Sequence, residues 1–231
     1  MRKPWIVLSP EQLTGRDQSH LQTEAGIALQ PDCWQAFAAL RAEAAEAGFD
    51  LQVASGFRSF ERQLAIWNGK AEGSREVHDD QSRVLDLGAL GELERVHAIM
   101  RYSALPGASR HHWGTDLDIY DAAAMPENYQ LQLSPAEYAD EGLFGPLHAW
   151  LVQRLDGERA QGFFRPYRRD RGGVAEERWH LSYAPLAEEC AQALTLKLLH
   201  GVLAGCELQL AEVVLQNLPQ LYTRYLTSAT A

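Results

Sequence analysis

Apolar residues at helical spacing alternate along the chain with short stretches in which every second residue is apolar. The first helix is predicted over residues 32–48, with a buried face made of Trp34, Phe37, Leu40 and Ala44. Asp32 is a typical N-cap, Gln35 can complete a capping box, and Gly48 is typical of a helix end. We therefore expect an amphipathic helix that packs one face on the core.

A strand, a turn and a second helix follow. Residues 51–54 alternate in the manner of a strand, and residues 55–58 have the composition of a turn. Ser59 would cap a helix whose buried positions are Phe60, Leu64 and Trp67. Arg58 and Gln63 then lie around the start of a helix that follows a strand, a common location for groups that hold anions or a substrate backbone.

The rest of the chain is predicted to start with a polar surface excursion over residues 70–90. In chain order the pattern then predicts a helix over 92–102 with Leu93, Val96 and Met100 buried, a strand over 116–120, a helix over 145–155, and strands over 163–167 and 178–183. The tail is different, because residues 186–203 and 207–218 are Leu- and Ala-rich helical patterns that Pro219 ends. We expect a C-terminal helical hairpin packed on the core. Its use in self-association is the alternative, and the oligomeric state stays open.

Composition and charge narrow the class of protein. The 231 residues suffice for one domain with an elaboration, and 46% apolar with 23% charged residues is ordinary for a globular protein. A net charge of −10 argues against a broad nucleic-acid-binding face. The chain has no run of about 18 apolar residues for a membrane span, and its first ten residues lack the apolar run of a secretory signal. The expected location is the cytoplasm, where Cys33, Cys190 and Cys206 would stay reduced.

Two separated segments carry the candidate chemistry. Residues 109–118 contain His111 and Asp118, and a second segment about sixty residues later contains Glu177 and His180. Two imidazoles and a carboxylate can hold a zinc ion with one position open for water, and the spare glutamate can act as general base. The segments therefore predict a catalytic Zn2+ site, although Mn2+ or Co2+ could occupy the same ligands.

Spacing alone leaves the carboxylate ligand open. In one regular strand His111 and Asp118 would face opposite sides, so Gly114 and Thr115 must interrupt the strand. Asp116 would share a strand face with Asp118, which makes Asp116 a rival ligand.

Both segments resemble the D-alanyl-D-alanine carboxypeptidase family related to the VanY resistance enzymes, zinc peptidases that share a fold with the Hedgehog signalling domain. The family pattern is Ser-x-His-x-x-Gly-x-Ala-x-Asp followed by Glu-x-x-His, and the matching positions here are Ser109, His111, Gly114, Asp118, Glu177, Trp179 and His180. Residues 55–59 and Gln63 resemble the family's upstream Ser-Gly-aromatic-Arg-Ser segment. The resemblance covers about residues 30–185 and departs from the pattern at Asp116, where the family usually has Ala.

The resemblance implies a small α+β fold in which helices flank an antiparallel sheet and zinc lies in a cleft. We assign residues 1–185 to this domain and residues 186–231 to a helical extension packed on it. The implied zinc ligands are His111, Asp118 and His180. The implied catalytic residues are Glu177, as general base, and Arg58, which would polarise the scissile carbonyl and stabilise the oxyanion. The expected substrate contacts are Ser109, Gln63, Trp179 and His112.

These roles predict a zinc metallocarboxypeptidase that removes the terminal D-Ala from peptidoglycan stem peptides. A cytoplasmic member would serve wall recycling by trimming recycled tetrapeptides, so we expect an L,D-carboxypeptidase whose partner is a muropeptide, with no nucleic acid or membrane. D,D-carboxypeptidase activity on pentapeptides is the close alternative. Two further functions fit less well: a non-catalytic zinc-containing peptide-binding protein and an endopeptidase. Glu177 and Arg58 argue against the binding protein, and the lack of a wall-targeting module argues against the endopeptidase.

Overall fold

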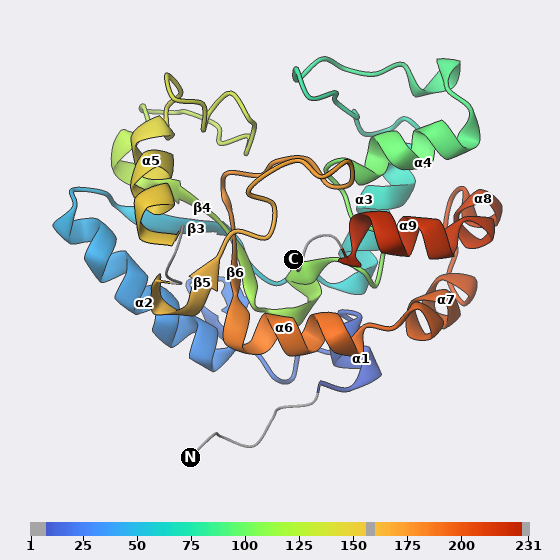
Figure 1. Ribbon diagram of the computed structural model, residues 1–231, viewed down its shortest axis with the longest axis horizontal. Helices are drawn as coiled ribbons and strands as arrows, with labels where there is room; N and C mark the ends of the chain where they lie inside the picture. Colours follow the sequence, from blue (N-terminus) through green and yellow to red (C-terminus); the bar gives the residue numbers. More distant parts are fainter. Residues whose placement is uncertain (1–7, 156–159, 228–231) are drawn as a thin grey trace.

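A four-stranded antiparallel sheet and a set of helices make up the molecule (Figure 1). The computed structural model describes residues 8–155 and 160–227. The sheet has the order β3–β4–β6–β5, with β3 at Leu51–Ser55, β4 at Asp116–Asp121, β6 at His180–Tyr183 and β5 at Phe163–Phe164. A hairpin of β1 (Gln22–Glu24) and β2 (Ile27–Leu29) forms a separate two-stranded sheet. The predicted α+β class with a small antiparallel sheet is confirmed.

Helices α2 (Pro31–Glu46) and α5 (Gly145–Leu155) share one hydrophobic core with the sheet. Its fully buried members include Leu40, Leu117 and Leu151. Helix α2 uses Gln30 as its N-cap without a side-chain hydrogen bond, so the predicted cap at Asp32 is wrong. The reason is Pro31, whose fixed φ and missing N–H suit the first helical position.

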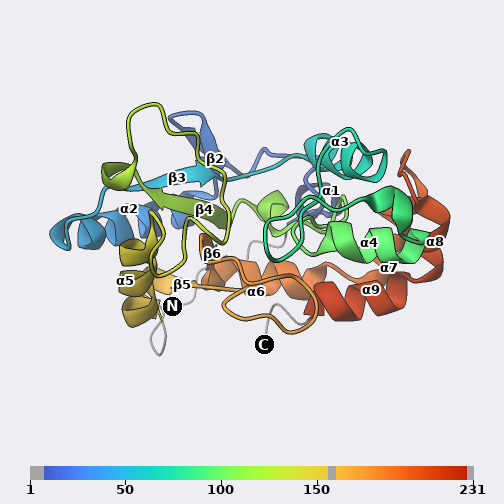
Figure 2. The ribbon, with the colours of Figure 1, turned by 90° about the horizontal axis from the view of Figure 1, so that it is seen from above.

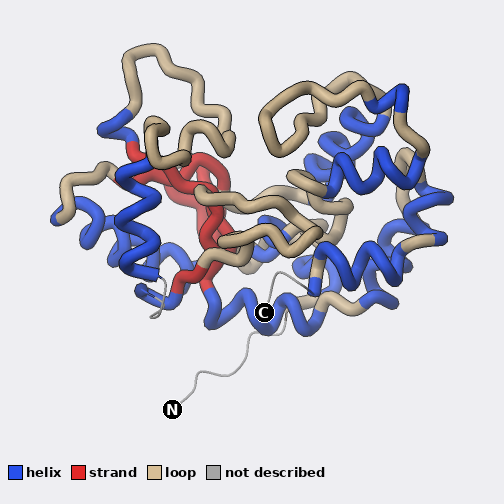
Figure 3. The backbone as a smooth tube through the Cα atoms, turned by 45° about the horizontal axis from the view of Figure 1, so that its top comes forward, coloured by secondary structure: helices blue, strands red, loops and turns tan. Residues whose placement is uncertain are grey.

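A second core fills the helical half of the molecule, on the side away from the strands (Figure 3). It joins α1 (Pro10–Leu13), α3 (Phe60–Ala71) and α4 (Glu92–Met100) to the C-terminal helices. Trp67, Ile99 and Leu199 are fully buried in this core. Short 3-10 turns complete the described chain: η1 (Leu87–Ala89), η2 (Arg110–Trp113), η3 (Ala122–Ala124) and η4 (Ala160–Gly162).

The C-terminal tail is divided more finely than the predicted hairpin. It forms α6 (Ala184–Ala193), α7 (Leu196–Ala204), α8 (Ala211–Gln216) and α9 (Leu218–Tyr225). Helix α6 begins directly after β6, and α7–α9 lie on the side of α3 and α4 in Figure 2. The predicted helix over 186–203 is interrupted because the Thr195 side chain accepts a hydrogen bond from Leu198 N and caps α7. Pro219 stands in the first turn of α9 and so begins a helix there.

The predicted helix around α3 is confirmed, whereas two neighbouring expectations fail. Ser59 accepts a hydrogen bond from Arg62 N at 3.2 Å and caps α3. On α4, Leu93 is 36% exposed although the pattern predicts that it is buried, and Ile99 takes that place in the core. The excursion after α3 is only partly a surface segment, because Val77 is buried and lines a cavity.

In the described residues, no helix has the length and apolar content needed to cross a membrane. The expectation of a missing export signal concerns residues 1–10, of which 1–7 lie outside the described residues.

Candidate metal centre and active site

The 3-10 turn η2 brings His111 to the end of the central sheet. It ends at Gly114, whose φ of +67° lies in the left-handed region that favours glycine. A Cβ at Gly114 would lie 2.3 Å from Leu21 Cδ2, so a larger residue there would also displace the Leu21 side chain. The turn redirects the chain between His111 and β4, and the predicted interruption of the strand is confirmed.

Three side chains from separate elements converge next to this turn. Asp118 on β4 lies opposite His180 on β6 in the strand register. Asp118 Oδ2 is 3.4 Å from His111 Nε2, and Asp118 Oδ1 is 3.3 Å from His180 Nδ1. Candidate ligand atoms of the three residues all lie within 4.8 Å of one another, and all three residues are buried. The sheet thus assembles two imidazoles and one carboxylate from positions 111, 118 and 180.

Hydrogen bonds on the far side of each imidazole set its tautomer. His111 Nδ1 lies 2.8 Å from the Gly56 carbonyl, which can only accept, so Nδ1 carries the proton. His180 Nε2 lies 2.9 Å from an Asp116 carboxylate oxygen and donates to it. His111 Nε2 and His180 Nδ1 are therefore the ring nitrogens that face the cluster, where each can offer a lone pair to a metal ion.

Asp116 lies behind His180 and not among the converging atoms. Its carboxylate accepts hydrogen bonds from Arg110 Nε at 2.7 Å, from Thr115 Oγ1 at 2.6 Å and from His180 Nε2. Asp116 is fully buried, and burial raises the pKa of its carboxyl, but Arg110 and the hydrogen bonds lower that pKa below its usual range overall. Of the two carboxylates that spacing left open, Asp118 lies in the cluster and Asp116 supports a histidine.

The cluster has the electrostatics of a cation site. Burial raises the pKa of the Asp118 carboxyl, but the two histidines lower it well below its usual range. Burial lowers the pKa of His180, but the carboxylates of Asp116, Asp118 and Glu177 around its ring raise that pKa well above the usual range, so a bound metal ion would replace the proton on Nδ1. Asp118 Oδ1 is also buried without a well-formed hydrogen bond from any described residue. An oxygen in this state fits a metal ligand, as does the mixed imidazole and carboxylate set.

Glu177 stands beside the cluster, just before β6 begins, as the spacing predicts. Its Oε2 is 3.3 Å from His180 Nδ1. Its backbone N–H donates to the Tyr167 carbonyl at 3.0 Å, which anchors the residue to the preceding loop. A carboxylate at this position can exchange a proton with a molecule bound at the cluster.

Arg58 is held by a set of buried polar groups. Its Nη1 donates to Gln63 Oε1 at 3.0 Å, and Gln63 Nε2 donates to the Ala104 carbonyl at 2.7 Å. Burial lowers the pKa of the Arg58 guanidinium, whereas Asp118 and Glu177 raise it. Gln63 is fully buried and uses its amide on Arg58 and Ala104, so its surroundings suit a positioning role better than the predicted substrate contact.

His112 is likewise a structural support for Arg58. Its ring is fully buried, Nδ1 donates to the Arg58 carbonyl at 2.7 Å, and Nε2 accepts from Gly107 N at 3.0 Å. Burial lowers its pKa to about 3, so the ring is neutral. With both nitrogens on backbone groups, His112 has no polar atom left for the predicted substrate contact.

A cavity of about 440 Å³ opens over the cluster, and we call it the central cavity. The converging residues line it together with Arg58, Glu177, Ser109 and Trp179. Trp179 packs on Tyr138, with 5.5 Å between ring centroids. The predicted substrate contacts Ser109 and Trp179 thus face the same space as the cluster.

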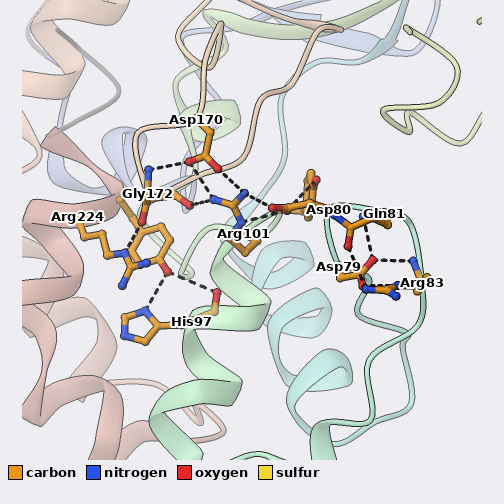
Figure 4. Close-up of polar contacts among 12 residues, drawn as sticks. Asp79, Asp80, Gln81, Arg83, His97, Arg101, Asp170, Gly172 and Arg224 are labelled. Carbon is orange, nitrogen blue, oxygen red and sulfur yellow. Dashed lines mark hydrogen bonds and ion pairs between the residues drawn. The ribbon is translucent and has the colours of Figure 1, made fainter.

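Arg101 ties together two segments that wall the central cavity (Figure 4). Its guanidinium donates to Asp80 in the excursion after α3 and to Asp170 in the loop before Glu177, with Nη2–Oδ2 distances of 2.7 and 2.8 Å. Its Nη1 also donates to the Gly173 carbonyl at 2.8 Å. These hydrogen bonds, with Asp170 contributing most, raise the pKa of Arg101, which stays charged.

Two residues of the cavity wall, Lys70 and Tyr167, lie outside the sequence motifs that predicted the site. Lys70, near the end of α3, lines the cavity, as does Tyr167, whose ring centroid is 5.0 Å from that of His180. Burial raises the pKa of Tyr167 to about 12. Tyr167 belongs to a predicted strand, and Lys70 stands at the start of a predicted surface excursion. Neither residue type is unusual in such a context, so local pattern had no means of selecting them.

Comparison with known proteins agrees with this geometry. The chain matches the family described as VanY, D-alanyl-D-alanine carboxypeptidase, over residues 26–186. Two proteins of Haemophilus influenzae, both described as uncharacterized, are similar to it. One is 48% identical over 103 residues, which cover 42% of this chain and 70% of that protein. The other is 34% identical over 124 residues, which cover 53% of this chain and 92% of that protein.

Solved structures are similar to this chain at low sequence identity. VanYB in complex with D-Alanine-D-Alanine has a TM-score of 0.50 at 19% identity and covers 80% of this chain and 89% of its own. A mutant of the vancomycin resistance D,D-pentapeptidase VanY in complex with Zn(II) has a TM-score of 0.49 at 21% identity. The match covers 76% of this chain and 84% of that chain. Because the family match spans well over half of the sequence and contains every residue of the cluster, the chain belongs to the VanY D-alanyl-D-alanine carboxypeptidase family.

Proposed function

We propose that this protein is a zinc-dependent carboxypeptidase that removes the terminal D-alanine from peptidoglycan stem peptides. The observation that carries the proposal is the placement of His111, Asp118 and His180 with Glu177 and Arg58 around one cavity. The three converging residues would hold the Zn2+ ion. The ring nitrogens that face the cluster and the unsatisfied Asp118 oxygen support this assignment.

Each residue has a role that its surroundings support. When bound, zinc supplies a Lewis acid that activates water and polarises a carbonyl. The Glu177 carboxylate takes the proton from the attacking water and delivers it to the leaving amine. Arg58 carries a fixed positive charge and several donors, so it stabilises the negative charge that develops on the scissile carbonyl oxygen. Gln63 and His112 hold Arg58 in place, and Ser109 and Trp179 contact the peptide.

The preferred substrate under this proposal is the tetrapeptide, which makes the activity L,D. Its residue before the scissile bond is diaminopimelate, whose side chain carries both an ammonium and a carboxylate. The central cavity has a volume of about 440 Å³, and its lining includes the polar residues His78, Asp79 and Ser82, which supports a long charged side chain at this position of the substrate. A pentapeptide would present only a methyl group at this position, and D,D activity is the competing candidate.

The test is mass spectrometry of products from the zinc-loaded protein incubated with muropeptide tetrapeptide and pentapeptide, with Glu177→Gln as control. Loss of one alanine from the tetrapeptide, absent in the variant, supports L,D activity. Loss from the pentapeptide alone moves the protein to the D,D class. Cleavage of neither substrate contradicts the proposal and favours a peptide-binding protein or an endopeptidase.

A further inference from the structure

Lys70 is a cation in the wall of the central cavity that forms no ion pair with a carboxylate of the described residues. Its Nζ donates to Ser103 Oγ at 2.6 Å, and both residues line the cavity with Arg58. Within residues 8–155 and 160–227, no carboxylate oxygen lies within 4.0 Å of Lys70 Nζ. Lys70 therefore differs from Arg101 and Arg110, which are paired with aspartates.

The unfavourable burial of two positive charges in one wall indicates that the cavity binds an anionic ligand. Burial and the charge of Arg58 lower the pKa of Lys70 to about 8, whereas Glu177 raises it. Two cations, Lys70 and Arg58, thus share one largely buried wall without an ion pair in the described chain. Unpaired buried charge is unfavourable unless a counter-ion completes it. An anionic group entering the cavity would supply that counter-ion.

On the basis of the proposed function, we infer that Lys70 and Ser103 bind the terminal carboxylate of the residue that the enzyme releases. A carboxypeptidase substrate places this carboxylate one residue beyond the scissile bond, and one residue spans about 3.8 Å. Lys70 and Arg58 line the same cavity, so one cation can take the carboxylate while the other takes the scissile carbonyl oxygen. Ser103 Oγ accepts from Lys70, so its hydroxyl proton is free to donate to the carboxylate.

This assignment makes Lys70 the residue that selects a free chain end. The test compares kcat and KM of the zinc-loaded wild type, Lys70→Met and Lys70→Arg on a tetrapeptide and on its C-terminal amide. We expect the wild type to prefer the free acid by on the order of 10- to 100-fold, mostly in KM, as expected for a charged hydrogen bond. Lys70→Met should lose most of this preference and Lys70→Arg should recover part of it. Lys197→Met, an exposed lysine on α7, is the matched control.

A binding measurement separates this inference from the proposed function. Calorimetric titration of the free-acid tetrapeptide and its amide into Glu177→Gln and into Glu177→Gln/Lys70→Met reports carboxylate recognition without turnover. If the double variant binds the free acid more weakly than Glu177→Gln does, but binds the amide equally well, the role of Lys70 is supported. This result would hold even if the wild type cleaved a different bond. The inference is overturned if Lys70→Met remains folded and keeps the wild-type preference for the free acid. An equal loss of binding affinity for the acid and the amide would also overturn the inference, because Lys70 would then contact a part of the peptide other than its terminal carboxylate.

Discussion

Asp116 shows how one buried carboxylate can orient a candidate metal ligand from outside the cluster. It accepts a hydrogen bond from His180 Nε2 and pairs with Arg110, whose Nη2 donates to Ser182 Oγ at 2.6 Å. Such a carboxylate fixes the tautomer of the imidazole and increases its basicity. Position 116 is also the place where the sequence departs from the family pattern that it resembles, which has alanine there.

We therefore predict that Asp116→Asn lowers zinc affinity by on the order of 10- to 100-fold. Competition with a chromogenic chelator measures this affinity without reference to activity. Ser182→Ala is the control, because it alters the same Arg110 network and leaves the Asp116–His180 contact in place. Circular dichroism must establish that Asp116→Asn is folded, since Arg110 loses its counter-ion. Unchanged zinc affinity in the folded variant would show that Asp116 does not orient His180.

Among the elements, the loop before β6 and the excursion after α3 depend on each other through Arg101. The loop also donates the Ala175 N–H to the Arg101 carbonyl at 3.0 Å, close to Glu177 in the chain. Arg224 of α9 donates to the Gly172 carbonyl of the same loop. The position of Glu177 thus depends on helices α4 and α9 as well as on the sheet.

Arg101→Met should loosen both cavity walls and raise KM on the order of ten-fold, because small misplacements of a reacting group are costly. Limited proteolysis should cut residues 72–91 and 165–176 faster than in the wild type. Arg41→Met is the matched control, since both side chains of the Arg41–Asp50 pair are exposed, and such pairs contribute about 0–1 kcal/mol. Wild-type KM and wild-type proteolysis in Arg101→Met would contradict a role for Arg101 in holding these segments.

The whole molecule combines a sheet core with a helical core, and the C-terminal helices belong to the second of these. Trp67 of α3 packs among them, and its indole N–H donates to the Gln209 carbonyl at 2.9 Å. Because α3 begins directly after the Arg58–Ser59 turn and carries Lys70, the tail supports the helix that holds residues of the central cavity.

Leu199→Ala should lower the free energy of unfolding by about 3 kcal/mol, the usual cost of a cavity in a packed core. Chemical denaturation of the full chain measures the change. Leu93→Ala removes the same atoms from a leucine that is 36% exposed and should change stability by less than ~0.5 kcal/mol. Similar losses in the two variants would mean that the tail is not packed as a core element.

Several features could be predicted from local patterns because they depend on neighbours within one turn or strand. The Ser59 cap, the existence of strand β4 and the break at Gly114 are examples. The prediction of one continuous helix over residues 186–203 is wrong at Thr195. There a capping side chain starts a new helix although the apolar pattern continues. The prediction that the excursion after α3 is a surface segment is only partly right. The excursion forms a wall of the cavity because of its contact with Arg101, which lies outside the excursion in the sequence.

The sequence by itself determined the chemical types at the centre: two imidazoles, a carboxylate, a spare glutamate and an upstream arginine, in an order that marks the family. Residue type and spacing are local properties, so they can be recognised without coordinates. Only the tertiary structure decided that Asp118 faces the cluster while Asp116 supports His180, and that Lys70 lies in the same cavity without a carboxylate partner among the described residues. These facts depend on strand register and on which buried groups find partners, and contacts between distant parts of the chain set both.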